Sequence, residues 1–136
     1  MDFLERLKKF HSHLGPFAVL GARMGKYAKN ELKATPFELE AEVYTTMHTP
    51  ESCVLDGVQF SSGCTLGKRN IIPKKSREIK GIFWKGNKEV TLTLKESILQ
   101  KIRRLKEEEI EEYATKLMKK KITVLFKTEK SWEEKK

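Results

Sequence analysis

Two histidines one residue apart, His11 and His13, stand just before the dipeptide Gly15-Pro16 in the stretch FHSHLGPF. Imidazole nitrogens are common ligands of zinc and other transition metals in proteins. On a continuous α-helix, side chains two positions apart point about 200° away from each other, so both could reach one metal only where the helix unwinds. The pair is therefore a candidate metal site. The alternative is two exposed side chains placed favourably at the C-terminus of a helix.

The two cysteines of the chain, Cys53 and Cys64, are the candidate sulfur ligands. We expect Cys53 in the first or second turn of a helix, where free N–H groups and the helix dipole favour the thiolate. Asp56 and Gln59 follow it at helical spacing, which indicates a polar site along one helix face. An unbroken helix would separate the two sulfurs by well over ~10 Å. A single cluster that contains both cysteines therefore requires the loop to fold back. The alternative is that each cysteine is a small buried residue and not a metal ligand.

The loop after this helix, GCTLGKRN at residues 63–70, is a candidate anion site. Its side chains Thr65, Lys68 and Arg69 suit a phosphate or carboxylate group. The loop lacks the spacing of a nucleotide-binding P-loop, however, and follows a helix instead of a strand. If the site is catalytic, we expect Asp56 to orient a ligand or move a proton and Lys68 to hold an anionic group.

The composition is that of one ordinary domain. With 136 residues, 38% of them hydrophobic and 35% charged, the chain is long enough to bury a core. Its N-terminus lacks the features of a signal peptide, and its longest apolar run, residues 17–22, is too short to span a bilayer. Two cysteines without an export signal indicate a reducing cytosol. Abundant Lys and Glu with few Gln are typical of proteins from hot environments.

The positive charge is concentrated in one segment. The net charge is +9, and residues 68–88 alone carry eight Lys or Arg against one Glu. Such a segment favours an anionic neighbour, so a module that binds nucleic acid or an acidic partner is the alternative function. Phe83 and Trp84 beside the lysines would be its stacking platform. One of two adjacent strand residues is expected to face the core, however, and no recognised nucleic-acid motif is present, so we favour the metal site.

Hydrophobic periodicity and turn residues predict the elements that position these groups. Helices are expected from about residue 4 to Gly15-Pro16, from Pro16 to about Lys33, and from Thr49-Pro50 to about Ser61, the last with Thr49 as N-cap and Gly63 closing it. Long helical structure, bent near Glu107–Glu109, is expected over 98–117. A first strand is expected over 36–46, with Phe37, Leu39, Ala41 and Val43 inward, and a second strand is expected to begin at Ile71. Residues 77–95 are expected to form a hairpin that turns at Gly86-Asn87, and residues 122–126 a last strand.

These elements predict an α+β fold, with an antiparallel or mixed sheet and helices packed on it, because strands and helices do not alternate regularly. We expect a single core domain over residues 1–128 and a charged tail over 129–136. Compact domains of this size often form homodimers, and the apolar residues of the last long helical region are a candidate interface.

Two stretches together resemble a known family. FHSHLGPFAVLGARMG at 10–25 resembles the F-H-G-H-x-C-P-G-x-x-x-G-x-R-x-G signature of the FmdE family, which is named after the E subunit of formylmethanofuran dehydrogenase. CVLDGVQFSSGCTLGKRNI at 53–71 is similar to that family's C-x-x-D-A-x-Q-x-x-x-G-C-T-x-G-K-G-N motif, which ends in Leu or Ile. The resemblance covers residues 3–72 closely, and both motifs occur in the same order and spacing.

The resemblance implies an α+β fold in which the His-x-His turn and the cysteine-bearing helix face a shared metal cleft. It favours zinc or another transition metal at His11, His13 and Cys53, and an accessory or redox-linked role beside oxidoreductase partner subunits. The chain departs from the motifs at Ser12 and Arg69, where the family has Gly, and at Gly15, where the family has Cys. We expect a core domain without the C-terminal zinc ribbon of many relatives. The family's catalytic chemistry resides in other subunits, so no independent activity follows from the resemblance.

Overall fold

The computed structural model describes residues 1–132 of the chain. Its helices are α1 (Phe3–His11), α2 (Pro16–Leu32), α3 (Val54–Ser62), α4 (Glu96–Arg103), α5 (Ile110–Leu117) and α6 (Ile122–Leu125). Its strands are β1 (Glu40–Thr45), β2 (Ile71–Lys75), β3 (Lys80–Lys85), β4 (Lys88–Leu94) and β5 (Phe126–Ser131). Short 3-10 turns at Glu51–Cys53 and Glu107–Glu109 lead into α3 and α5. The predicted α+β class is confirmed.

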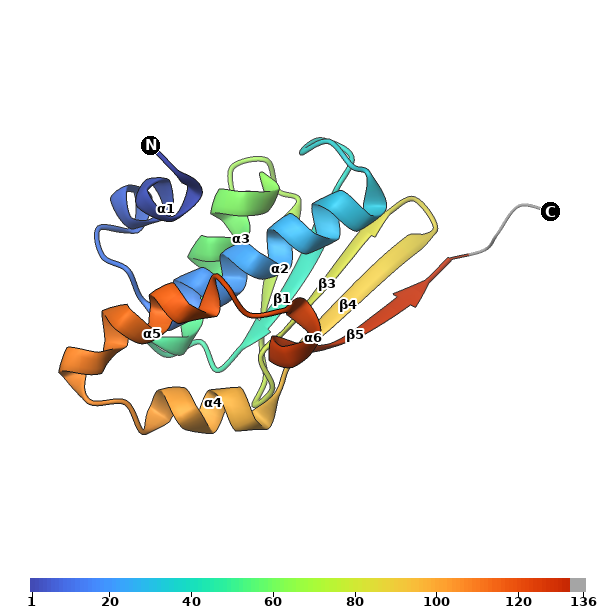
Figure 1. The fold of residues 1–136 in the computed structure, drawn as a ribbon. Helices are drawn as coiled ribbons and strands as arrows, with labels where there is room; N and C mark the ends of the chain where they lie inside the picture. The colour runs from blue at the N-terminus through green and yellow to red at the C-terminus, as the bar shows by residue number, and fades with distance from the viewer. Residues whose placement is uncertain (133–136) are drawn as a thin grey trace.

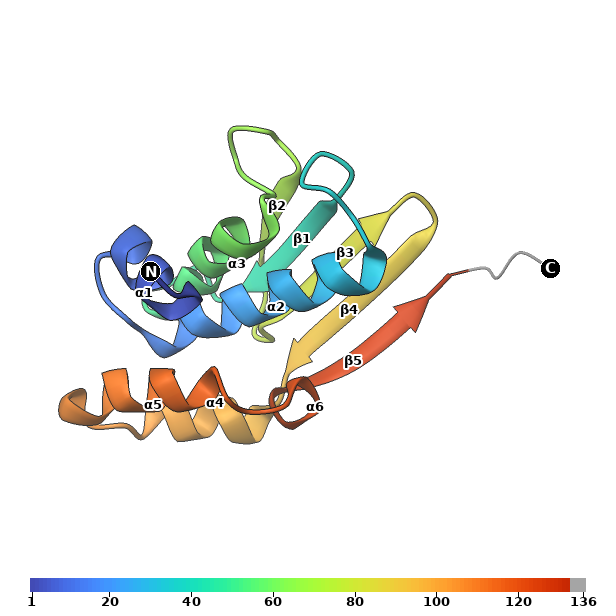
Figure 2. The same ribbon diagram turned by 45° about the horizontal axis from the view of Figure 1, so that its top comes forward.

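The five strands form one mixed sheet in the order β2-β1-β3-β4-β5. Only β1 and β2 run parallel, and the other pairs are antiparallel. In Figures 1 and 2, α2 and α3 lie across one face of the sheet, and the described part of the chain places no helix over the other face. Alternate strand residues are buried beneath these helices, among them Ala41, Val43, Phe83, Val90 and Leu92. The hydrophobic core therefore lies between the sheet and α2–α3.

Two glycines let α2 and α3 cross in close contact. A Cβ atom on Gly21 would collide with the Val54 carbonyl oxygen, and one on Gly57 would collide with the Ala18 carbonyl oxygen. Glycine is required because backbone occupies the place of a side chain. This crossing holds the N-terminal end of α2, just after the histidines, against the start of α3, just after Cys53.

The first predicted strand begins later than the alternation indicates. The alternation places Phe37 inward, but this side chain is 84% exposed. Residues 35–38 form a turn, with the Glu38 N–H donating to the Thr35 carbonyl, and β1 starts at Glu40. The inward positions Leu39, Ala41 and Val43 are confirmed as buried.

The third helix also begins later than predicted. Thr49 is not its N-cap, since the turn at Glu51–Cys53 intervenes and α3 starts at Val54. The prediction for its end is confirmed: Gly63 caps the helix with a φ of 76°, a left-handed conformation that glycine adopts without steric cost.

The C-terminal region differs from the prediction in one element. The break at Glu107–Glu109 and the hairpin turn at Gly86-Asn87 are confirmed. Residues 122–125 form α6 instead of a strand, because β4 gives way to α4 at Leu94 and leaves no ladder partner beyond Phe126. The last strand instead runs from Phe126 to Ser131, three residues past the predicted boundary at 128. Of the predicted charged tail at 129–136, residues 133–136 lie outside the described residues.

Within residues 1–132, none of the helices has the length and apolarity needed to cross a lipid bilayer.

Candidate metal site

The end of α1 unwinds at the His-x-His turn. His11 is the last residue of α1, and Ser12 caps the helix in a left-handed conformation with a φ of 73°. As a result the rings of His11 and His13 do not point apart as they would on a helix; their centroids lie 4.6 Å from each other. The condition for bringing the two imidazoles together is met, although His13 remains exposed to solvent.

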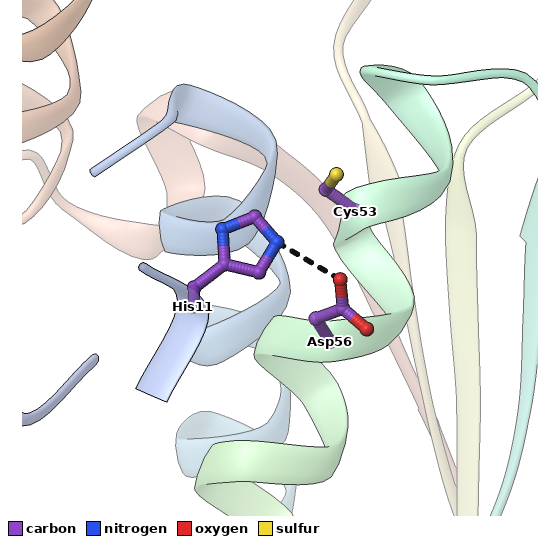
Figure 3. Close-up of side chains that lie close together, drawn as sticks. All are labelled: His11, Cys53 and Asp56. Atoms are coloured by element: carbon purple, nitrogen blue, oxygen red, sulfur yellow. Dashed lines mark hydrogen bonds and ion pairs between the residues drawn. The ribbon is translucent and has the colours of Figure 1, made fainter. Parts of the chain in front are cut away.

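His11, Cys53 and Asp56 form a cluster of metal-ligand type between α1 and the start of α3 (Figure 3). One ligand atom from each lies within 4.8 Å of the other two. His11 Nε2 is 2.9 Å from Asp56 Oδ2, an ion pair when the ring is protonated. Cys53 and Asp56 share a face because they are three residues apart at the beginning of the helical segment. Both groups are half-buried, as is His11.

The environment of Cys53 favours the thiol over the thiolate, contrary to the expectation from its place near a helix start. Burial raises the pKa of Cys53, and the nearby Asp56 carboxylate raises it further. The helix proper starts only after Cys53, so the thiol lies in a 3-10 turn and has no capping hydrogen bond from its side chain. A metal bound here would have to displace the thiol proton.

One ring nitrogen of His11 is buried without a partner. The side chain is 10% exposed, Nε2 contacts Asp56, and Nδ1 has no hydrogen-bond partner within the described residues. A buried polar atom without a hydrogen-bond partner destabilises the folded state. Packing of the core therefore does not explain why a histidine occupies this position. This observation supports a functional role for the ring.

Gly15 lies beside His13. A Cβ atom built on Gly15 would be 3.3 Å from His13 Nε2. The side chain of a cysteine at this position would therefore contact the His13 ring. Glycine avoids this contact.

The structure places Cys64 away from this cluster. Its thiol is fully buried and donates to the Leu39 carbonyl at 3.4 Å, in the core beneath β1. Its backbone N–H donates to Ser62 Oγ. Cys53 precedes α3 and Cys64 follows it, so the helix separates the two sulfurs as its length predicts.

The candidate anion residues lie at the far end of α3 from Cys53. Lys68 Nζ donates to the Gly63 carbonyl at 2.7 Å, and the Lys68 N–H donates to Thr65 Oγ1. Arg69 is exposed and has a φ of 61°. Thr65 and Lys68 thus bind the loop to itself and to the end of α3, and the structure does not bring them to His11 and Cys53.

A hollow of about 250 Å³ adjoins the cluster, lined by Thr49, Ser52, Cys53, Leu55, Asp56, Gln59, Leu66, Ile71 and Pro73. Gln59, which the helical spacing placed on the same face as Cys53, accepts a hydrogen bond from the Leu66 N–H and so fixes one wall. The sequence indicates Thr49 only as a helix cap and gives no signal for Ser52, because hydroxyl groups beside a helix start are ordinary there.

The basic segment 68–88 does not form one aromatic platform. Phe83 is fully buried under the helices, whereas Trp84 is half-buried on the opposite face of β3. Two lysines of the segment are in ion pairs, Lys74 with Glu42 and Lys85 with Glu38. This arrangement favours the metal site over the stacking platform as the functional feature.

Comparisons with known proteins agree with this architecture. The family model described as FmdE, molybdenum formylmethanofuran dehydrogenase operon, matches residues 10–136. A protein of Archaeoglobus fulgidus named a probable S-adenosyl-L-methionine-binding protein is 37% identical over 71 residues, which is 51% of this chain and 19% of that protein. The chain therefore spans about a fifth of the length of that relative.

The fold is shared with a solved structure. The crystal structure of a tungsten formylmethanofuran dehydrogenase FmdE-like protein from Syntrophus aciditrophicus superposes with a TM-score of 0.70. The match covers 97% of this chain and 71% of the other, at 16% identity.

Proposed function

The chain belongs to the FmdE family, and we propose that it is a metal-binding domain of that family, with zinc held by His11, Cys53 and Asp56. The observation that carries the proposal is the convergence of one nitrogen, one sulfur and one carboxylate oxygen within 4.8 Å. This borderline-soft set suits zinc, and another transition metal would accept the same ligands. Ligand atoms around tetrahedral zinc lie about 3.3–3.8 Å apart. The imidazole and carboxylate atoms, 2.9 Å apart, would separate slightly, and the most distant pair of the three, within 4.8 Å, would approach by about an ångström.

Three protein ligands leave a coordination position for water, substrate or a fourth side chain. His13 is a candidate fourth ligand, since its ring lies 4.6 Å from that of His11. We propose the hollow lined in part by Cys53 and Asp56 as the route by which a small molecule would reach this position. When bound, zinc would supply Lewis acidity, and the Asp56 carboxylate oxygen that does not bind the ion is then the atom to orient a ligand or hold a proton. Lys68, at the other end of α3, is the weaker catalytic candidate.

The role that fits this site is accessory or redox-linked, beside oxidoreductase subunits in the cytosol. Support comes from the family description, which names a dehydrogenase operon. A second copy of the chain is a further proposed partner, and this homodimer is independent of the metal.

Metal analysis of untagged protein tests the site. We expect about one zinc per chain in the wild type and a loss of most of it in His11→Ala and in Cys53→Ala, because each removes a ligand. Cys64→Ala is the matched control, since it removes the other thiol from a place outside the cluster. Unchanged stoichiometry in both ligand variants would refute the site, and a loss in Cys64→Ala alone would move it to the second cysteine.

The alternative function, nucleic-acid binding by the segment 68–88, has its own test. Counterion release would make the affinity for an oligonucleotide fall steeply with salt. Binding that is weak at every salt concentration removes the alternative.

A further inference from the structure

Figures 1 and 2 show the face of the sheet that α2 and α3 leave uncovered. The strand register aligns three rows of outward side chains across the strands. The row at one end runs Lys74, Tyr44, Lys80, Thr93, Lys127. The middle row runs Ile72, Glu42, Ile82, Thr91, Glu129. The row at the other end runs Glu40, Trp84, Glu89, Ser131. We call this surface the open face.

One end of the open face is built to accept a cation. Trp84 on β3 is flanked by Glu40 on β1 and Glu89 on β4 in register. Neither glutamate makes an ion pair within residues 1–132. Trp84 and Glu89 line a hollow of about 360 Å³. Lys88 shares this hollow and its Nζ lies 5.9 Å from the Trp132 ring centroid. An aromatic ring between two carboxylates attracts an ammonium group both through the ring face and through charge.

The other end supplies that cation. Lys80 lies on the same strand as Trp84, four residues earlier, with Ile82 midway between them. Its Nζ lies 4.8 Å from the centre of the Tyr44 ring, so the lysine is held on the face, and it makes no ion pair within the described chain. The two other lysines of this row, Lys74 and Lys127, are already paired with glutamates of their own copy.

From this complementarity we infer that the open face is the interface of a symmetric homodimer, with Lys80 of each copy bound between Glu40, Trp84 and Glu89 of the other. The twofold axis would lie between the two sheets, perpendicular to the strands, and pass at Ile82. Rotation about this axis places Lys80 of each copy over Trp84 of the other, so the pairing occurs twice. It also brings the two Ile82 side chains together. Such isologous contacts are the usual basis of homodimers, and face-to-face sheets pack about 10 Å apart. The inference rests on the proposed homodimer and names its surface.

The size of the face sets the expected strength of the dimer. Five strands at about 4.8 Å spacing and three rows about 6.6 Å apart give roughly 500 Å² per copy. A typical specific interface buries about 800 Å² per partner. We therefore expect a dimer that dissociates on dilution and in high salt, since exposed charge pairs are screened.

A charge-swap experiment tests the pairing on the full chain by sedimentation. In low salt and at high micromolar concentration we expect a wild-type dimer. Lys80→Glu places like charges opposite Glu40 and Glu89, and the double variant Glu40→Lys, Glu89→Lys does the same to Lys80. We expect each to weaken self-association about tenfold or more. An equimolar mixture of the two variants has attractive charges at both contacts, and we expect it to restore a dimer.

The control is Lys119→Glu, which makes the same charge change between α5 and α6, at an exposed position away from the open face. Circular dichroism verifies that each variant is folded. A monomeric wild type would overturn both the homodimer and its surface. If the wild type dimerises and both charge variants dimerise as strongly, the assignment of the dimer to the open face is wrong. The same holds if the mixture of the two variants remains monomeric. None of these three results bears on zinc content.

Discussion

Two single residues hold backbone conformations that favour glycine. Ser12 has a φ of 73° and Arg69 a φ of 61°, and both stand where the family motif has glycine. Backbone geometry explains glycine at these two motif positions: one lets the chain turn between the histidines, and the other closes the loop after Cys64. The sequence could identify the departures but not their left-handed conformation, because no local pattern marks it.

Arg69→Gly is expected to stabilise the protein by about 0.5–1 kcal/mol, because glycine removes the steric cost of a left-handed residue. The Arg69 side chain is exposed, so little packing is lost. Urea denaturation measures the change. Arg104→Gly is the matched control, since Arg104 is also exposed but has a φ of −96°; we expect it to give no gain. Equal effects at the two positions would contradict the explanation.

The buried thiol of Cys64 predicts a loss of stability at alkaline pH. Burial raises the pKa of Cys64 above the ordinary value of 9.0. The unfolded chain therefore releases this proton at lower pH than the folded one, and stability is retained below about pH 9 and lost as the pH rises toward the folded pKa. The unfolding free energy of Cys64→Ala, measured in metal-free buffer over the same range, should fall less steeply. Identical slopes would show that Cys64 does not contribute.

At the scale of secondary-structure elements, the crossing of α2 and α3 decides where the site forms. Gly21 and Gly57 let the two backbones meet, and α3 then presents Cys53 and Asp56 toward the end of α1. Local patterns predicted α2, the hairpin and the cap at Gly63, because each depends on neighbouring residues. They could not predict α6 or the exposure of Phe37, because those depend on where β4 ends and where residues 35–38 turn.

Gly57→Ala is expected to destabilise the protein by about 1–3 kcal/mol, because its methyl group would collide with backbone atoms of α2. We expect zinc content to fall with it, since α3 must move away from α2. Gly67→Ala is the control: its Cβ would meet only Thr65 Oγ1, at 3.9 Å. Denaturation midpoints and zinc content of both variants check the prediction, which a fully stable Gly57→Ala would refute.

At the scale of the whole molecule, the sheet separates the two surfaces to which we assign a function. The helix-covered face leads to the candidate metal site, and the open face carries the charge rows of the proposed dimer. Residue types and spacing identified His11 and Cys53 as candidate ligands. They could not show that the two side chains lie close together, because the residues are 42 positions apart in the chain. Only the packed fold, or the resemblance to a family that shares it, could indicate that contact.

Metal binding at a folded site should raise the stability of the whole domain. A ligand that binds only the folded state at a concentration 100 times its dissociation constant adds about 2.7 kcal/mol. We expect zinc to raise the melting temperature of metal-free wild type and to leave that of Cys53→Ala unchanged. Removal of zinc by a chelator should reverse the shift. An equal shift in both proteins would indicate binding elsewhere.

X-ray absorption at the zinc edge of the purified protein tests the account most directly, because it reports the ligands of the ion. The predicted result is one sulfur at about 2.3 Å with nitrogen and oxygen ligands at about 2.0–2.2 Å, and the sulfur should be missing in Cys53→Ala. A zinc ion without sulfur in the wild type, or with its sulfur retained in Cys53→Ala, would contradict the site formed by His11, Cys53 and Asp56.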